Sequence, residues 1–333
     1  MTFLSWLFPK LPEGATGLMN LGNTCYLNSV LQCLSHTEYL TEFALQYKLP
    51  YYIKGDQQRH YTESVAESMI QVIQQIYSAQ STISPKEFLI TFRAYNKSFC
   101  NGEQKDAAEF LMLLITKVDS DLRNQTYSVP PPSVISADYV QSFVDYSLKN
   151  RSIITQIMGG MIHTHLECSF CKASNDFSEP FTIIQLPIQI MFSTNNCKMP
   201  YITLYDCLES FMQSSHVCSV CFKLQTPYRT FVATPPILVF QLLRFKQTEK
   251  GSEKDTTRVF YPLRDLVVSG VKYELYSQII HYGKINSGHY TANCVINGEW
   301  FAFNDGSVDK IENANVMNSS AYLLFYKRTE TPK

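Results

Sequence analysis

The sequence lacks a net charge of either sign: 28 Lys and Arg stand against 29 Asp and Glu in 333 residues, a formal charge of −1. Because basic residues are not in excess, the protein lacks the overall positive potential that attracts phosphate groups. Binding to nucleic acid or to an anionic membrane is therefore not expected as its main activity. The sequence also has no run of about 18 apolar residues, the length that a spanning helix needs. We therefore expect no membrane span. The 45% of hydrophobic residues suffice for a sizeable core, so we expect a folded protein.

An export signal is also missing. Residues 1–8 are apolar but have neither a basic leading region nor a small-residue cleavage site. Residues 1–14 are therefore interpreted as a leader that packs, stays mobile or serves as a targeting or docking element. The ten cysteines are expected in a reducing compartment, the cytoplasm or the nucleus, where close pairs bind metal or do chemistry more often than they form disulfides.

The chain has no internal repeat, and its two halves differ in the spacing of apolar residues. Before the proline run at residues 130–132 the spacing is helical, around residues 27–34, 65–76 and 110–118. After residue 180, short β-branched and aromatic runs predict strands at residues 182–190, 237–245, 273–282 and 322–327. Helices followed by strands indicate the α+β class.

Three local signals refine this outline. Ser84 and Glu87 form a capping-box pattern, which predicts the start of a short helix. Asn297 and Gly298 stand between two strand-like runs and predict a tight hairpin. The polar residues 251–257 are expected to form a flexible loop.

Cys25 stands where a loop turns into a helix, because the helical spacing begins at Leu27 and Asn23 or Thr24 can cap the helix. Unpaired N–H groups and the helix dipole stabilise a thiolate at such a position, which favours a nucleophile. The alternative is a small core residue, since free cysteine is commonly buried. The Gly, Asn and Thr residues around Cys25 argue against that alternative.

A thiolate nucleophile needs a base, and the base needs an acceptor that orients it; neither has to be near in sequence. His289 lies in a glycine-flanked turn at the head of the predicted hairpin, and the return strand ends at Asn304. Two adjacent strands would place Asn304 beside the His289 ring. The six other histidines are interpreted as ordinary surface or core residues.

These residues resemble the two catalytic boxes of the ubiquitin-specific proteases, a family of cysteine deubiquitinases. The boxes are residues 17–32 around Cys25 and residues 282–305 around His289. The resemblance also takes in residues 104–110, the close cysteine pairs and the strand before Arg244-Phe245.

The resemblance implies a papain-like fold in one catalytic domain, residues 15–328, shaped like a hand. The expected parts are a helical thumb at about 15–145, β-rich and zinc-pinned fingers at about 160–235, and a β-sheet palm at about 236–328. A C-terminal tail at 329–333 would follow. The cleft between thumb and palm would hold Cys25 and His289.

The family pattern also implies roles for three polar residues near the cleft. The first polar residue after the Trp-x-x-Phe strand orients the histidine in this family, and here it is Asn304. Asp305 is also expected to matter. On a regular strand the side chains of Asn304 and Asp305 point to opposite faces, so only one of them can face His289. If the strand bulges here, Asp305 could supply the carboxylate that orients the histidine, or it could order the oxyanion site. Asn20 resembles the family's oxyanion-hole amide, with a turn-forming asparagine as the alternative.

Four cysteines stand in two CxxC pairs with 46 residues between the pairs: Cys168, Cys171, Cys218 and Cys221. Two such knuckles make a closed tetrahedral site of four thiolates, which is structural because no position is left for water. The resemblance implies one zinc ion here that pins the fingertips, and four metal-free thiols are the alternative. The other cysteines are expected to be core or surface thiols.

Gln104, Asp106 and Glu109 resemble the family's segment along the channel for the ubiquitin tail, where a carboxylate can pair with basic residues near the ubiquitin terminus. A solvated first helical turn, with acidic residues facing the dipole, is the alternative. Gly283 and Gly288 are expected to let their loop approach the substrate diglycine, because a Cβ would crowd the channel.

The resemblance thus implies a thiol-dependent deubiquitinase that hydrolyses the isopeptide or peptide bond after the C-terminal glycine of ubiquitin, without a catalytic cofactor. Ubiquitin and ubiquitinated proteins would be its partners, and a regulatory protein partner is left open. The alternatives are a protease for another ubiquitin-like modifier, a catalytically weak ubiquitin-binding scaffold, and a zinc-ribbon module that binds nucleic acid. The complete catalytic set argues against the scaffold, and the missing basic patch argues against the ribbon module.

Overall fold

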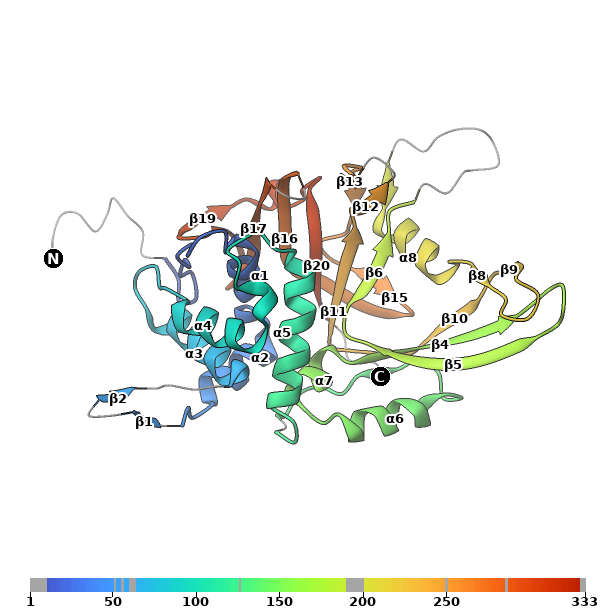
Figure 1. Cartoon of the computed structure of the whole chain (residues 1–333), viewed down its shortest axis with the longest axis horizontal. Helices are drawn as coiled ribbons and strands as arrows, with labels where there is room; N and C mark the ends of the chain where they lie inside the picture. Colours follow the sequence, from blue (N-terminus) through green and yellow to red (C-terminus); the bar gives the residue numbers. More distant parts are fainter. Residues whose placement is uncertain are drawn as a thin grey trace.

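The computed structural model describes residues 11–50, 52–54, 57–59, 64–125, 127–189, 201–248, 251–284 and 287–329. A body of helices lies on one side of a large sheet, and a long strip of strands extends away from that sheet (Figure 1). This arrangement confirms the α+β class. In the described ranges, no helix is long and apolar enough to cross a membrane. Most of the expected leader, residues 1–10, lies outside the described residues.

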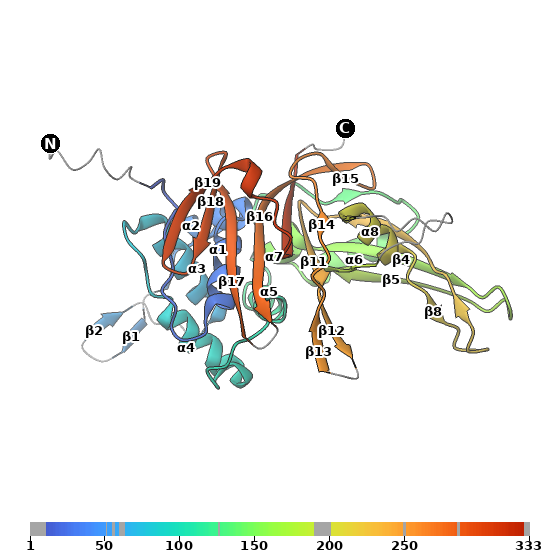
Figure 2. The ribbon, with the colours of Figure 1, turned by 90° about the horizontal axis from the view of Figure 1, so that it is seen from above.

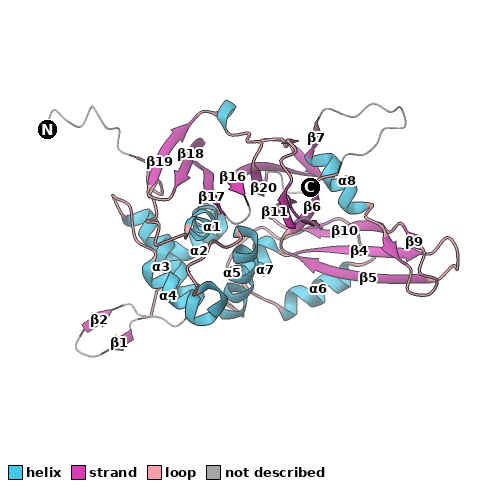
Figure 3. Ribbon diagram, turned by 45° about the horizontal axis from the view of Figure 1, so that its top comes forward, coloured by secondary structure: helices cyan, strands magenta, loops and turns pink. Residues whose placement is uncertain are grey.

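The N-terminal part is helical, as the apolar spacing predicts. Its main helices are α1 (Cys25–Ser35), α2 (Glu38–Gln46), α3 (Val65–Ser78), α4 (Lys86–Tyr95) and α5 (Ala107–Asp121). All residues of α1 are buried, since this helix lies between the other helices and the sheet (Figure 3). A short hairpin of β1 (Tyr52–Lys54) and β2 (Gln57–Arg59) projects from this part, and α6 (Val140–Lys149) and α7 (Ile153–Met158) follow it.

The large sheet has the strand order β19-β18-β17-β16-β20-β11-β6, with β15 on β16. Its strands are β6 (Ile184–Pro187), β11 (Ile237–Leu243), β15 (Leu266–Val268), β16 (Val271–Lys284), β17 (Ser287–Ile296), β18 (Glu299–Asn304), β19 (Ser307–Ile311) and β20 (Ala321–Arg328). Only β6 and β11 pair in parallel among these described strands.

Both faces of this sheet are buried, because its side chains alternate between two cores. Leu323 and Phe325 of β20 join the core shared with α1 to α5. Leu324 and Tyr326 join a second core, which is completed by α8 (Leu204–Met212). The sheet is therefore a rigid support for residues at its strand ends.

The extended strip is a second sheet of order β3-β10-β4-β5. Its strands are β3 (Ser133–Val134), β4 (Gly160–Glu167), β5 (Ser174–Phe181) and β10 (Tyr228–Thr234), and a small hairpin of β8 (His216–Val217) and β9 (Leu224–Gln225) lies at its far end. Figure 2 shows this end on the side of the molecule opposite to α1 and β17. Two further small pairs are β7 (Ile202–Thr203) with β14 (Val259–Phe260) and β12 (Phe245–Thr248) with β13 (Gly251–Lys254).

Local signals gave mixed results. The hairpin at Asn297-Gly298 is confirmed, and both residues have the positive φ that this turn requires, 51° and 81°. The helix expected after Ser84 exists, but it begins at Lys86 with Pro85 as N-cap and without a side-chain cap bond. The loop expected at residues 251–257 is wrong in its first half, because Gly251–Lys254 forms β13 against β12.

Candidate active site

Cys25 is the first residue of α1, as the helical spacing predicts. The loop before it is shaped by Asn20, whose Oδ1 accepts hydrogen bonds from the backbone N–H groups of Gly22 (3.0 Å) and Thr24 (3.2 Å). Gly22 and Asn23 both have positive φ, which turns the chain sharply into the helix. Cys25 is only 3% exposed, so it is buried at the start of the helix.

His289 lies on β17, beside α1. Its Nε2 lies 2.7 Å from Oδ1 of Asn304, the last residue of β18. An amide oxygen only accepts, so Nε2 carries the proton and Nδ1 of the neutral ring is left as an acceptor. The backbone N–H of the next residue, Tyr290, acts to lower the pKa of the Cys25 thiol, and α1 packs against β17.

The thiol of Cys25 is less acidic than its place at a helix start suggests. Burial raises its pKa above the ordinary value of 9.0, and the negative charge of Asp305 raises it further. The N–H groups of Tyr290, Tyr26 and Cys25 itself act in the opposite direction, but they do not outweigh burial. The expected thiolate is therefore corrected to a neutral thiol at pH 7, whose proton a base has to remove.

Asp305 does not contact His289, because it lies in the two-residue turn between β18 and β19, with φ of 50°. Its Oδ2 accepts from Asn20 Nδ2 (2.9 Å), and its Oδ1 accepts from Asn28 Nδ2 (2.7 Å). Its backbone carbonyl accepts from Leu18 N–H (2.9 Å). Asp305 thus fixes the loop before Cys25 and leaves one N–H of the Asn20 amide for another acceptor.

Asn28 is a site residue that the sequence reasoning missed. It is 2% exposed and lies three residues after Cys25, so it shares a face of α1 with the thiol. The available signal was an asparagine three residues after the candidate nucleophile, a spacing that places both on one face of a helix. Besides Asp305, its Nδ2 reaches the backbone carbonyls of Leu18 and Met19.

The predicted tail-binding residues have different surroundings. Gln104 makes two hydrogen bonds with the backbone of Gly288, one to its carbonyl (2.7 Å) and one from its N–H (2.8 Å). Asp106 caps α5 by accepting from two N–H groups of the first helical turn, and its Oδ2 also accepts from Tyr322 Oη (2.7 Å). Its carboxylate is thus used inside the protein, whereas the side chain of Glu109 is exposed.

Gly283 and Gly288 have a reason to be glycine that lies within the chain itself. Gly283 has φ of 86°. A Cβ on Gly288 would collide with the ring of His281, which is 1% exposed, and with the carbonyl of Tyr282. The space that a side chain would need is therefore already filled by protein atoms.

The four paired cysteines meet at the far end of the strip, with all their sulfurs within 4.8 Å of one another. Cys168 and Cys171 lie in the β4–β5 turn, and Cys218 and Cys221 lie between β8 and β9. The cross-pair sulfurs are 3.5 and 3.6 Å apart. Tetrahedral zinc with Zn–S bonds of about 2.3 Å places its sulfurs about 3.8 Å apart, so the cluster fits that ion.

The two knuckles have the same backbone. In each, the residue after the second cysteine has φ of 59°, and its N–H donates to the carbonyl of the first cysteine, 2.9 Å in both. N–H groups of Cys171 and Phe170 lower the pKa of Cys168 to about 6, and those of Cys221 and Val220 lower that of Cys218. At the first cysteine of each pair these N–H groups favour the thiolate, the form that binds a metal, whereas the side chains of the other three cysteines raise the pKa of Cys221 to about 12.

A family model described as "Ubiquitin carboxyl-terminal hydrolase" matches residues 16–326. "Ubiquitin carboxyl-terminal hydrolase 2" of Rattus norvegicus is 32% identical over 351 residues, which take in 97% of this chain and 55% of that protein. "Ubiquitin carboxyl-terminal hydrolase 3" of Homo sapiens is 27% identical over 354 residues, which take in 94% of this chain and 68% of that protein. The chain thus spans about half the length of the first of these relatives.

Solved structures show the same fold. One is the structure of the SAGA Ubp8/Sgf11/Sus1/Sgf73 DUB module bound to ubiquitin aldehyde, with a TM-score of 0.71 and 22% identity over 98% of this chain and 72% of that chain. Another is the same module with a substituted Ubp8, bound to monoubiquitin. Its TM-score is 0.70, with 23% identity over 96% of this chain and 70% of that chain.

Proposed function

Because the chain belongs to the ubiquitin carboxyl-terminal hydrolase family, we propose that it is a cysteine protease that hydrolyses the bond after the C-terminal glycine of ubiquitin. One observation supports this proposal most strongly. Asn304 holds the His289 ring through Nε2, the N–H of the next residue, Tyr290, lowers the pKa of the Cys25 thiol, and β17 packs against α1, so nucleophile, base and orienting group come together at the start of α1.

The proposed reaction starts from the neutral thiol. His289 Nδ1 takes the proton of Cys25 as the sulfur attacks the glycine carbonyl, and Asn304 keeps the ring in the tautomer that can accept it. The free N–H of the Asn20 amide and backbone N–H groups at the start of α1 would hold the oxyanion. His289 then donates the proton to the leaving lysine amine, and a thioester remains.

Water completes the cycle. His289 removes a proton from water, the hydroxide attacks the thioester carbonyl, and ubiquitin leaves with a free carboxylate while the sulfur recovers the proton. Asp305 contributes by position: it holds Asn20 and Asn28, and so keeps the oxyanion amide in place. The chemistry uses no cofactor.

We also propose a structural role for one zinc ion at Cys168, Cys171, Cys218 and Cys221. The sulfur separations and the paired knuckles support it, and so does the position of the cluster at the far end of the strip, where the apolar side chains of Phe170, Val220 and Phe222 are exposed instead of packed in a core. The strip is proposed to hold ubiquitin, with Gln104 and Glu109 contacting its tail. A thiol nucleophile has to stay reduced, which fits the cytoplasm or the nucleus.

Turnover of defined substrates tests the function. Purified protein is incubated with ubiquitin that carries a fluorogenic C-terminal amide, with isopeptide-linked diubiquitin, and with fluorogenic forms of other ubiquitin-like modifiers. We expect hydrolysis of both ubiquitin substrates, loss of it in Cys25→Ala, and retention of most of it in Cys33→Ser, the matched thiol two turns further along α1. Turnover of another modifier alone would make the chain a protease for that modifier, and turnover by Cys25→Ala would end the assignment.

A further inference from the structure

Gln104 holds the residue that precedes the proposed base. Its Nε2 donates to the carbonyl of Gly288 (2.7 Å), and its Oε1 accepts from the N–H of the same residue (2.8 Å). An amide side chain offers a donor and an acceptor as a peptide group does, so Gln104 pairs with Gly288 in the way that a residue of a neighbouring strand would. The next residue along β17 is His289.

Gly288 needs such a partner, because the sheet supports it on one side only. Gly288 pairs with Gly283 of β16, whereas the described pairing of β17 with β18 starts at Ala292 and runs away from the site. Glycine also has more backbone freedom than any other residue. The two hydrogen bonds from Gln104 therefore restrain the backbone where it is most free to move, directly before His289.

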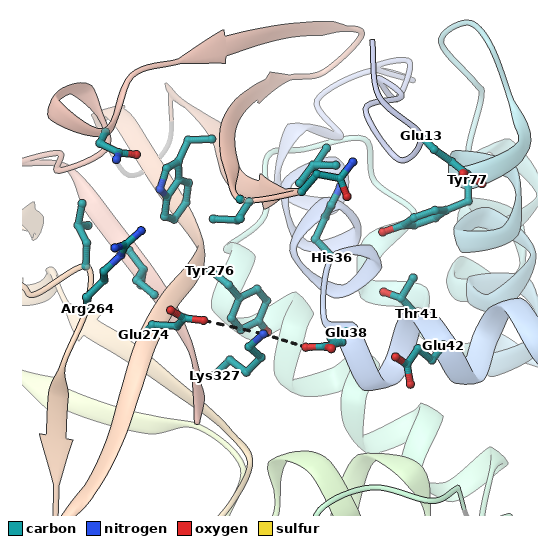
Figure 4. A pocket seen from close by; sticks show the side chains of 18 residues that line it. Glu13, His36, Glu38, Thr41, Glu42, Tyr77, Arg264, Glu274, Tyr276 and Lys327 are labelled. Carbon is teal, nitrogen blue, oxygen red and sulfur yellow. Dashed lines mark hydrogen bonds and ion pairs between the residues drawn. The ribbon is translucent and has the colours of Figure 1, made fainter. Parts of the chain in front are cut away.

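The restraint on His289 is local. The buried His281 ring lies against Gly288, since a Cβ on that glycine would collide with its Nε2. Gly288 is thus held between this ring and the Gln104 amide. The far end of β17 is packed less closely, because Val295 and Ile296 line a cavity of about 900 Å³. Figure 4 shows this cavity, which lies beside His36 at the opposite end of α1 from Cys25.

The start of α5 gives Gln104 a fixed base. Asp106, two residues later, is the N-cap of α5, and its Oδ2 accepts from the hydroxyl of Tyr290 (3.4 Å). The segment before α5 therefore contacts both neighbours of His289, Gly288 through Gln104 and Tyr290 through Asp106.

We propose that Gln104 is a positioning residue, which acts through Gly288 to keep the His289 ring within reach of the Cys25 thiol. This inference rests on the proposed function, and it adds to the tail contact, for which one N–H of the Gln104 amide remains. Position matters because the neutral thiol of Cys25 has to pass its proton to a base within hydrogen-bond reach. A displacement of about 1 Å in such a site can lower the rate about 10²-fold.

Steady-state kinetics separate the two roles of Gln104. Turnover of ubiquitin with a fluorogenic C-terminal amide is measured for Gln104→Ala and for Gln104→Met, whose side chain has a similar length but no strong donor or acceptor. We expect both to lower kcat by about 10- to 100-fold with an unchanged melting temperature. Gln80→Ala is the control, because Gln80 is an exposed glutamine in the loop between α3 and α4, and it should leave kcat unchanged. A rise in KM without a fall in kcat would leave only the tail contact and overturn the proposal.

A double-substitution cycle tests whether Gln104 acts through His289. The rate of adduct formation with a ubiquitin that carries a thiol-reactive electrophile at its C-terminus is compared for the unsubstituted protein, Gln104→Ala, His289→Ala and the double variant. Residues that act as a unit are not additive, so we expect Gln104→Ala to slow the reaction about tenfold or more when His289 is present and less than about twofold when it is absent. Equal losses in both backgrounds would overturn the proposal.

Hydrogen exchange of the Gly288 N–H, followed by NMR, needs no ubiquitin. We expect the exchange to be about tenfold faster or more in Gln104→Ala, because the N–H loses its acceptor. Unchanged exchange would show that Gln104 does not hold Gly288 and would overturn the proposal. Failure of the unsubstituted protein to react with the ubiquitin probe would instead contradict the proposed function, so the two failures are distinct.

Discussion

The carboxylate of Asp305 accepts a 2.7 Å hydrogen bond from Asn28, on the same helical face as Cys25. The neighbouring Asn304 instead contacts the His289 ring. Two adjacent residues therefore serve different parts of the site: Asn304 orients the base, and Asp305 holds the loop with Asn20.

Substitutions can separate these two roles. We expect Asn304→Ala to lower kcat by about one to two orders of magnitude, since a positioned hydrogen bond is lost, and Asp305→Ala to be at least as damaging. Asn304→Asp should retain activity because a carboxylate also accepts from Nε2. Asp305→Asn should lose activity, because the amide has a single acceptor oxygen for the two donors, Asn20 and Asn28. If Asn304→Ala leaves kcat unchanged, a residue other than Asn304 orients His289.

Alkylation of Cys25 by iodoacetamide reports the pKa of its thiol. Burial and Asp305 raise that pKa, so the thiol stays protonated through neutral pH and gains reactivity only as pH rises past the ordinary value of 9.0. We expect the rate for Cys25, followed by peptide mass spectrometry, to keep increasing above that pH. A rate at pH 6 equal to the rate at pH 9 would show a preformed thiolate and contradict this expectation.

Metal analysis tests the cysteine cluster. We expect one zinc per chain in protein purified without chelator, and its loss in Cys171→Ser. Because the cluster is at the far end of the strip, metal loss should lower the melting temperature and weaken ubiquitin binding, while Cys25 alkylation is unchanged. A chelator that stops turnover at once without altering the melting temperature would indicate a catalytic metal.

Asp106 is expected to act on stability. Asp106→Ala removes the α5 cap, worth about 0.5–2 kcal/mol, and also the acceptor of the Tyr322 hydroxyl. Urea unfolding should show at least that loss. Glu109→Ala, on the exposed side of the same turn, should leave stability nearly unchanged and raise KM for ubiquitin substrates. The reverse pattern would make Asp106 the substrate contact.

Features that depend on local sequence could be predicted. The helix start at Cys25, the turn at Asn297-Gly298 and the strand at Ile237–Leu243 follow from short-range spacing and turn chemistry. The place of His289 and Asn304 on neighbouring strands follows from the same hairpin.

Features that depend on long-range packing could not be predicted from the sequence. Asn28 meets Asp305 across 277 residues of chain, and Gly288 is glycine because the buried His281 ring occupies the space. The neutral Cys25 thiol is another case, since the helix dipole is visible in the sequence whereas the burial that outweighs it is a property of the folded chain.

The most direct test of the central claim uses ubiquitin with a thiol-reactive electrophile at its C-terminus. We expect one adduct per chain, mapped by peptide mass spectrometry to Cys25, with loss of the adduct in Cys25→Ala and slower formation in His289→Ala. An adduct on any other cysteine, or no adduct from a folded protein, would contradict the account.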